Sequence, residues 1–565
     1  MESGKYQKLP HSPESNPSGE SSSNIPKETI KMQDLDKRDY NEIEETASST
    51  LLEESTIGEG AKVSYLQDLE DLPQGRHLGL FSTIILFVSR ILGSGIFSIT
   101  GGIYSDCGQS PALFFLAWFI ACVASFGGLY VFLEMGSIVP RSGGAKVFLE
   151  FIYTKPELLA PVAYSVYSVL FGFTISNVLV FGEYCIHAIG VTPTDFRTRA
   201  TGLLFLYFAA FMHGVHVSHG VRIQNILGGL KLILLGIMGL AGLCVIIFPQ
   251  SFTGIENQLH GSSFFTSKSE VSVATFASAV IKASFAFSGW NSVHTVSNEI
   301  IDPVRTFKIA GPTSLTIITI AYLITNWAYL AVIPSEELVN SHTLVGAILF
   351  EKIFGKRIGQ QFLTFAVALC AGGNIFVVLY TISRVSQEVF REGYLPGSKF
   401  MSSNWPFGAP LRTLILSISI TTTIVCLSPH GGDIYNYMVA LEGYPQQVAI
   451  ALVAIGIFIV RKRHPDLHPP IRSGVVGTLL VFFISVYLVI GPFVSKHSPN
   501  PKGLESWPSY GITGTIAILA CILFWVFKFR LLPWLGGYRL VQEERQLHDG
   551  LNIKQWKKVY NYSEF

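Results

Sequence analysis

Two short stretches of the sequence place glycine and serine where an uninterrupted helix is expected. The first, ILGSGIFSIT, covers residues 91 to 100 and puts Gly93, Ser94 and Gly95 inside a long apolar run. The second, FAFSGW, covers residues 285 to 290. A single glycine in an apolar helix commonly serves close packing. Two glycines around a hydroxyl, with a similar stretch later in the chain, instead predict two interrupted helices.

An interrupted helix exposes backbone groups that can bind a ligand. Amide and carbonyl groups without intrahelical partners are not tolerated in apolar surroundings unless something polar satisfies them. The amides at the start of a half-helix, at the positive end of its dipole, suit a carboxylate. Free carbonyls at the end of the other half-helix suit an ammonium group. The two breaks therefore suggest, as a hypothesis, a receptor for the charged groups of an α-amino acid.

Charged side chains inside apolar runs are the second set of candidates. Lys231 lies roughly 13 Å along a helix from Arg222, too deep to reach water easily, and we interpret it as functional. Arg90 and Glu442 are each either coupling residues or buried structural charges. Lys282 is expected to reach the surface or to form a structural ion pair.

Other kinds of chemistry find no support in the sequence. The seven cysteines contain no CxxC pair, so we expect neither a disulfide framework nor a metal site. The chain has no nucleotide-binding loop and no nucleophile elbow. We therefore expect no enzyme activity, no cofactor and no nucleic-acid partner.

The elements that carry these residues follow from a strongly apolar composition. Of the 565 residues, 49% are hydrophobic and 14% are charged, and the mean hydropathy is +0.42. This is too apolar for a soluble protein of this size. Apolar segments of about 20 residues, long enough to cross a bilayer, recur along the chain. We predict an all-α membrane protein with twelve transmembrane helices, at residues 79–105, 111–138, 158–188, 200–218, 223–248, 272–298, 309–333, 359–390, 411–428, 435–460, 473–495 and 510–532.

The positive charges of the loops predict the orientation. Short loops on one side carry fourteen Lys and Arg residues and those on the other side carry eight, which places both termini in the cytoplasm. We expect residues 1–77 to be a disordered tail, 78–532 to be the membrane domain and 533–565 to be a second tail. Trp556 in the second tail lies either on the membrane or against the cytoplasmic loops.

Longer motifs resemble those of a known family. They are ILGSGIF in the first span, FLEMGSIVPRSGG after the second, LGGLKL in the fifth, FAFSGWNSVHTVSNEIIDPVRTFKIAGP around the sixth and SRVSQEVFREGYLP after the eighth. Over about residues 75–535 they resemble, in the same order, the L-type branch of the amino acid, polyamine and organocation transporters. Within that branch, SWPSYGI and LLPWLGGYRL look most like the fungal methionine permeases.

This resemblance implies a fold and a role for one cation. The fold is leucine-transporter-like, with spans 1 to 5 and 6 to 10 as inverted repeats and with broken first and sixth helices. Lys231 matches a lysine that replaces the sodium ion of sodium-coupled relatives and ties the first helix to the eighth. Sodium coupling is then not expected.

The resemblance also implies a substrate site. The carboxylate would bind the amides of Ser94 and Gly95, and the ammonium would bind the carbonyls of Ile91, Phe285 and Ser288. Phe285 would be the aromatic gate. The residues implied for this site are Ile91, Gly93, Ser94, Gly95, Phe285, Ser288 and Gly289.

Two features depart from the animal members of the branch. Those members pair with a heavy chain through a cysteine in the loop after the third span, but the loop GVTPTDFRTRA has none. We therefore expect no disulfide-linked heavy chain. Arg90 replaces a small polar residue and would put a cation beside the amino acid site.

The implied function is a secondary active transporter. It would import L-methionine, with cysteine and other neutral amino acids as possible further substrates, across the plasma membrane by alternating access driven by protons. The alternatives are a broad-specificity neutral amino acid exchanger, in the plasma or vacuolar membrane, and a receptor that binds an amino acid without transporting it. Expected partners are membrane lipid and, at the N-terminal tail, ubiquitin ligase machinery acting on Lys5, Lys8, Lys27, Lys31, Lys37 or Lys62.

Overall fold

A computed structural model describes residue 76 and residues 78–560, with gaps at 94, 173, 193, 260–263, 341–344, 429–433, 495–507 and 548–550. The expected N-terminal tail, with its lysines, lies outside the described residues apart from Arg76. Everything below concerns the described residues, which all lie in the unit from Val63 onward.

Long apolar helices make up most of the described chain. Eight helices among the described residues have the length and composition to cross a membrane, and they establish a multi-pass membrane protein. They are Pro111–Ile138, Leu159–Ala188 (interrupted between Leu170 and Ile175), Val217–Ile247, Pro303–Val332, Thr364–Arg391, Leu441–Arg463, Val475–Phe493 and Tyr510–Gly536. Two shorter apolar helices, Leu80–Ile91 and Leu411–Leu427, accompany them.

In the first half of the described chain, two predicted spans are interrupted: a break was expected in the first of them but not in the other. The predicted span 79–105 is divided into three helices, and the predicted span 158–188 into two. The elements in order are α3 (Leu80–Ile91), α4 (Gly95–Ser98), α5 (Thr100–Asp106), α6 (Pro111–Ile138), α7 (Ala145–Ile152), α8 (Leu159–Leu170), α9 (Ile175–Ala188), α10 (Asp195–Val215), α11 (Val217–Ile247) and α12 (Gln250–Thr253).

The second half repeats this mixture of long and interrupted helices. The predicted span 272–298 is an α-helix followed by a 3₁₀-helix, and α16 is kinked at Gly355. The elements are α13 (Val273–Ala286), η2 (Trp290–Glu299), α14 (Pro303–Val332), α15 (Ser335–Asn340), α16 (Val345–Arg391), α17 (Ser398–Met401), α18 (Leu411–Leu427), α19 (Ile434–Arg463), α20 (Val475–Val494), α21 (Tyr510–Trp525), η3 (Val526–Leu531) and α22 (Leu532–Gly536).

Local sequence explains where several of these helices begin. Asp302 caps α14, since its carboxylate accepts a hydrogen bond from the amide of Arg305 at 3.3 Å, and Pro303 follows at the first helical position. At the start of α13, Ser272 and Thr275 form a reciprocal capping box. These caps fix the start of the helix before the second break, α13, and of the helix that follows η2, α14.

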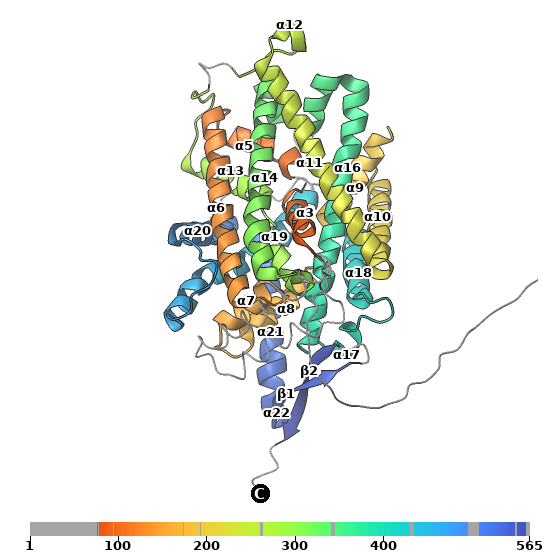
Figure 1. The fold of residues 1–565 in the computed structure, drawn as a ribbon, viewed down its shortest axis with the longest axis vertical. Helices are drawn as coiled ribbons and strands as arrows, with labels where there is room; N and C mark the ends of the chain where they lie inside the picture. Colours follow the sequence, from red (N-terminus) through yellow and green to blue (C-terminus); the bar gives the residue numbers. More distant parts are fainter. Residues whose placement is uncertain are drawn as a thin grey trace, which may run out of the picture. The chain divides into compact units, whose positions relative to one another are not determined.

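Helix α3 lies among the long helices of the bundle (Figure 1). It packs against α11, α14, α16 and η2, and most of its side chains are buried. Small residues allow close packing between other pairs: a side-chain carbon on Gly127 of α6 would lie 2.5 Å from the backbone of Gly477 in α20. Helix α3, which ends at the first break, is therefore packed against four other elements.

A β-hairpin follows the last helix. Strands β1 (Tyr538–Gln546) and β2 (Asn552–Tyr560) pair antiparallel, with Tyr538 opposite Tyr560, and lie at the end of the bundle opposite α12 (Figure 1). The bundle is helical as expected, but the hairpin was not predicted. The indole of Trp556 donates to the carbonyl of Glu392 at 3.1 Å and stacks on Tyr394. Of the two placements left open for Trp556, the structure has it against the chain that follows α16.

Candidate functional site

The first helix break lies at the end of α3. The amide of Leu92 still donates to Val88 at 2.8 Å, but the amide of Gly93 turns back to the carbonyl of Ile91 at 2.9 Å. Regular helix resumes at Gly95. Ser94, the residue implied to offer one carboxylate-binding amide, lies outside the described residues.

The second break lies between α13 and η2. The amide of Ser288 donates to the carbonyl of Phe285 at 3.0 Å, and Gly289 has a φ of +109°. A side-chain carbon on Gly289 would lie 2.7 Å from the carbonyl oxygen of Arg90 in α3. The two breaks are therefore in direct backbone contact, and only glycine fits both the conformation and the space at this position.

Tyr322 connects the two breaks from α14. Its buried hydroxyl is 3.1 Å from the carbonyl of Ala286, which ends α13, and 3.5 Å from the carbonyl of Ile91, which ends α3. A hydroxyl has one proton, so it donates to one of these carbonyls at a time. This residue was not predicted, because an isolated tyrosine in an apolar span has no sequence signal of its own.

Lys231 ties the end of α3 to two other helices. Its ammonium donates to the carbonyls of Ser89 at 3.1 Å and Leu92 at 3.0 Å, and to the side-chain oxygen of Asn374 in α16 at 2.8 Å. The side chain is only 1% exposed. Because all three acceptors are neutral, the buried charge is compensated by hydrogen bonds to two backbone carbonyls near the end of α3 and to one side-chain oxygen, rather than by an ion pair.

A third break, absent from our predictions, separates α8 from α9. The chain leaves the helix after Leu170 and resumes it at Ile175. The start of α9 binds the carboxylate of Glu442 from α19: the amide of Ser176 lies 3.4 Å from one oxygen, and its hydroxyl lies 2.9 Å from the other. A carboxylate at the positive end of a helix dipole is favourably placed.

One cavity of about 300 Å³ joins the three breaks. Of the sequence-predicted residues that the structure describes, Ile91 and Lys231 are not in its lining. Those that line it are Arg90, Gly93, Gly95, Phe285, Ser288, Gly289 and Glu442. The cavity also takes in polar and aromatic residues that sequence reasoning missed, among them Tyr164, Phe171, Gln446 and Gln447.

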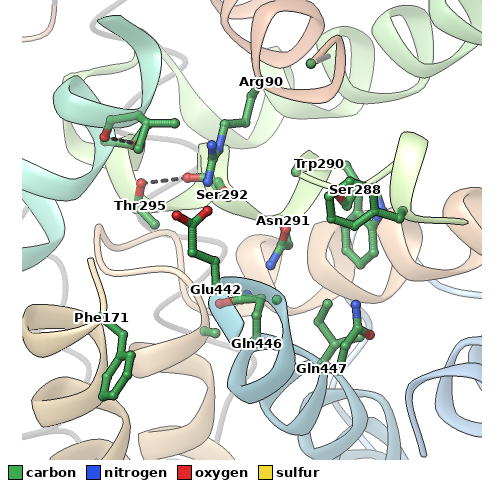
Figure 2. A pocket seen from close by; sticks show the side chains of 18 of the residues that line it. Arg90, Phe171, Ser288, Trp290, Asn291, Ser292, Thr295, Glu442, Gln446 and Gln447 are labelled. Carbon is green, nitrogen blue, oxygen red and sulfur yellow. Dashed lines mark hydrogen bonds between the residues drawn. The ribbon is translucent and has the colours of Figure 1, made fainter. Parts of the chain in front are cut away.

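Arg90 and Glu442 are the charged side chains among the described residues that line the cavity. Figure 2 shows the guanidinium of Arg90 directed toward the carboxylate of Glu442. The Nε of Arg90 is buried and has no hydrogen-bond partner among the described residues. One positive and one negative group give the cavity no net charge, which suits a ligand that carries one charge of each sign.

The three carbonyls implied to bind an ammonium group differ in the hydrogen bonds that they already accept. The carbonyl of Ile91 accepts from Gly93 and faces Tyr322, and the carbonyl of Phe285 accepts from Ser288. The carbonyl of Ser288 has no hydrogen-bond partner among the described residues. Since each carbonyl oxygen has two lone pairs, Ser288 offers the most free acceptor capacity of the three. Phe285 itself is 39% exposed and faces the cavity.

Lys282 and His294 lie away from this cavity lining. The ammonium of Lys282 forms an ion pair with Asp106 at 2.7 Å, which joins α13 to α5, in keeping with the structural role expected for it. His294 is fully buried among phenylalanine rings, with Phe307 the nearest at 4.6 Å between centroids.

Comparisons with known proteins agree with the motifs. A family model described as amino acid permease matches residues 78–527. The chain is 45% identical over 488 residues to the low-affinity methionine permease of Saccharomyces cerevisiae, covering 86% of this chain and 89% of the relative. It is 30% identical over 502 residues to the high-affinity methionine permease of the same yeast, covering 87% and 86%. It is 26% identical over 425 residues to the human Asc-type amino acid transporter 1, covering 74% and 78%.

Proposed function

The chain belongs to the amino acid permease family, and from this premise we propose that it imports L-methionine across the plasma membrane together with protons, by alternating access. Membership makes it an amino acid transporter and not an enzyme. Methionine as the substrate is supported by the two methionine permeases that resemble the chain over more than four fifths of its length.

The observation that carries the proposal is the contact between the two breaks at one cavity. The backbone of Gly289 meets that of Arg90, and Tyr322 reaches the ends of both α3 and α13. The cavity of about 300 Å³ lies at the lower end of the range for small-molecule sites, roughly 300 to 1,000 Å³. A single amino acid fits such a space.

In the proposed complex, the substrate carboxylate binds the amides of the first break, at Ser94 and Gly95. The ammonium binds the carbonyls of Ser288, Phe285 and Ile91, with Ser288 providing the freest acceptor. Phe285 covers the bound amino acid as the gate. Lys231 stands in place of a bound sodium ion and holds α3 against α16.

For proton coupling, we assign the proton-carrying role to Glu442 and a supporting charge to Arg90. Glu442 faces the cavity, and its carboxylate accepts from the amide and the hydroxyl of Ser176. A carboxylate that gains a proton there loses its attraction to Arg90, which lies on the first broken helix. Protonation and movement of that helix would thereby be linked.

The proposed membrane arrangement has twelve spans, two inverted repeats of five helices and both termini in the cytoplasm. The eight long helices and the two shorter apolar ones support most of the spans. Helices α10 and α13 with η2 supply the other two. The outward apolar faces contact lipid, and the lysines of the N-terminal tail are proposed targets of a ubiquitin ligase.

The test is uptake of labelled methionine into cells that lack their own methionine carriers, at pH 5 and pH 7. Unlabelled methionine, leucine and cysteine serve as competitors. Saturable uptake that is displaced best by methionine and abolished by a protonophore is expected. Equal displacement by leucine without effect of the protonophore would favour a broad exchanger, and surface expression without uptake would favour a receptor.

A further inference from the structure

Two neighbouring glutamines on α19 bring unused hydrogen-bond donors to the cavity. Gln446 and Gln447 lie one turn after Glu442 and both line the cavity. Figure 2 shows both of them on α19, the helix that also carries Glu442. They therefore belong to a different element from α3, α13 and η2, which meet at the first two breaks.

The carboxamide oxygens of both glutamines already have partners. The oxygen of Gln446 accepts from the hydroxyl of Tyr164 at 3.4 Å, and that of Gln447 accepts from the hydroxyl of Ser485 at 3.1 Å. These bonds fix the side chains to α8 and α20. Because a carboxamide has its oxygen and its amide nitrogen on opposite sides, they also direct the two NH₂ groups away from those helices.

The NH₂ groups have no acceptor among the described residues. Together they offer four N–H donors next to a lining that also contains apolar side chains, such as Phe171 and Ile450. A thioether sulfur is a weak acceptor and cannot satisfy these donors well, whereas an oxygen bonded to that sulfur can. The cavity thus has room for a methionine-like chain and donors for an oxygen at its end.

We propose that Gln446 and Gln447 form a side-chain subsite for neutral amino acids with an acceptor oxygen near the end of the chain, represented by the S-oxide of L-methionine. This inference rests on the proposed function, since it names a further substrate of the same cavity. The glutamines are its specificity-determining residues, because they make the contact that separates the S-oxide from an apolar side chain of equal length.

The experiment measures competition against labelled methionine in vesicles reconstituted with the full chain. The competitors are L-methionine S-oxide and L-norleucine, which has the same length but no acceptor. In the wild type, the S-oxide is expected to compete within about threefold of methionine itself. In the double variant Gln446→Leu/Gln447→Leu, the inhibition constant of the S-oxide should rise about tenfold, as the loss of one to two neutral hydrogen bonds predicts. The inhibition constant of norleucine should change by less than about threefold.

The matched control is Gln224→Leu, a buried glutamine on α11 outside the cavity lining; it should leave the ratio of the two inhibition constants unchanged. An S-oxide that does not compete in the wild type, or a ratio that the double variant does not change, would overturn the subsite. If the wild type takes up no methionine at all, the proposed function fails instead. Protection of the purified wild type against thermal unfolding by the S-oxide then still tests the subsite, and no shift contradicts it.

Discussion

The ammonium group of Lys231 donates a hydrogen bond of 3.0 Å to the carbonyl of Leu92, the residue that follows the last turn of α3. It also binds Asn374 at 2.8 Å, so one cation holds the first break against α16. We predict that Lys231→Met, which keeps the length of the side chain but removes its charge, lowers uptake at least tenfold. The carbonyls of Ser89 and Leu92 and the side-chain oxygen of Asn374 lose their donor. Each hydrogen bond to a charged group contributes roughly 1.5 to 3 kcal/mol to stability.

The measurement is initial uptake divided by the amount of protein at the cell surface. Lys282→Met serves as the control, since it removes a charge from a half-exposed ion pair. A normal rate per surface molecule for Lys231→Met would show that the lysine is only a packing residue.

A second prediction separates substrate binding from packing at the first break. A side-chain carbon on Gly95 would meet Ala286 at 3.4 Å, an ordinary contact, whereas one on Gly289 would lie 2.7 Å from the carbonyl of Arg90. Gly95→Ala should therefore reach the cell surface but lose uptake, because the methyl group hinders a carboxylate at the amide. Gly289→Ala should reduce the amount of folded protein. Full uptake by Gly95→Ala would refute the carboxylate site.

Tyr322 gives a third prediction. Tyr322→Phe removes only the hydroxyl that reaches Ala286 and Ile91. We expect uptake to fall about threefold to tenfold, since one neutral hydrogen bond to a broken helix end is lost. The methionine affinity of the purified protein should change less than the transport rate. Unchanged transport would mean that the bridge between the breaks has no part in the cycle.

The carboxylate of Glu442 is the subject of the fourth prediction. Glu442→Gln keeps an oxygen that can accept from Ser176 but cannot gain or lose a proton. Uptake by this variant should no longer increase when the external pH is lowered from 7 to 5. The initial rate at the two pH values is the readout, and Glu134→Gln, outside the cavity, is the comparison variant. If uptake by Glu442→Gln is still faster at pH 5 than at pH 7, the coupled proton is carried by another residue.

The fifth prediction concerns the junction between the hairpin and α16. Glu392 forms ion pairs with Arg141, with Lys146 at 3.1 Å and with Lys554 of β2 at 3.2 Å. Burial raises the pKa of this carboxyl, but the three cations outweigh burial and hold the pKa well below its ordinary value. The reciprocal effect of Glu392 raises the pKa of Lys554 against its own burial.

A lowered folded-state pKa stabilises the protein above the unfolded pKa of about 4.3 and loses that effect as the pH falls toward the folded value. Glu392→Gln should thus reduce stability at pH 7 by roughly 3 to 5 kcal/mol. The difference in melting temperature from the wild type should shrink below about pH 4. Glu543→Gln, which breaks the exposed pair with Lys557, is the control and should change little. An equal effect of the two substitutions would contradict the account.

The features that the sequence could predict are those with a local signal. Apolar length predicts the long helices, and the glycine and serine clusters predict the ends of α3 and α13. The depth of Lys231 in an apolar run marks it as unusual. The permease family was also recognisable from motifs spread along the chain.

The remaining features depend on contacts between distant residues. Ser176 meets Glu442 across 266 positions and Tyr322 meets Ile91 across 231, so neither pairing has a sequence period that could reveal it. The break before α9 has only Gly172 and no paired glycine as a signal. The hairpin strands are rich in charged residues, which made them resemble a solvated tail.

The most direct test of proton-coupled methionine transport uses vesicles that contain only the purified protein. Labelled methionine is supplied outside, with an inside pH of 7.5 and an outside pH of either 7.5 or 5.5. The account predicts transient accumulation of methionine above its external concentration only with the acidic outside, and loss of that accumulation in Glu442→Gln. Equal, purely equilibrating uptake under both conditions would contradict it.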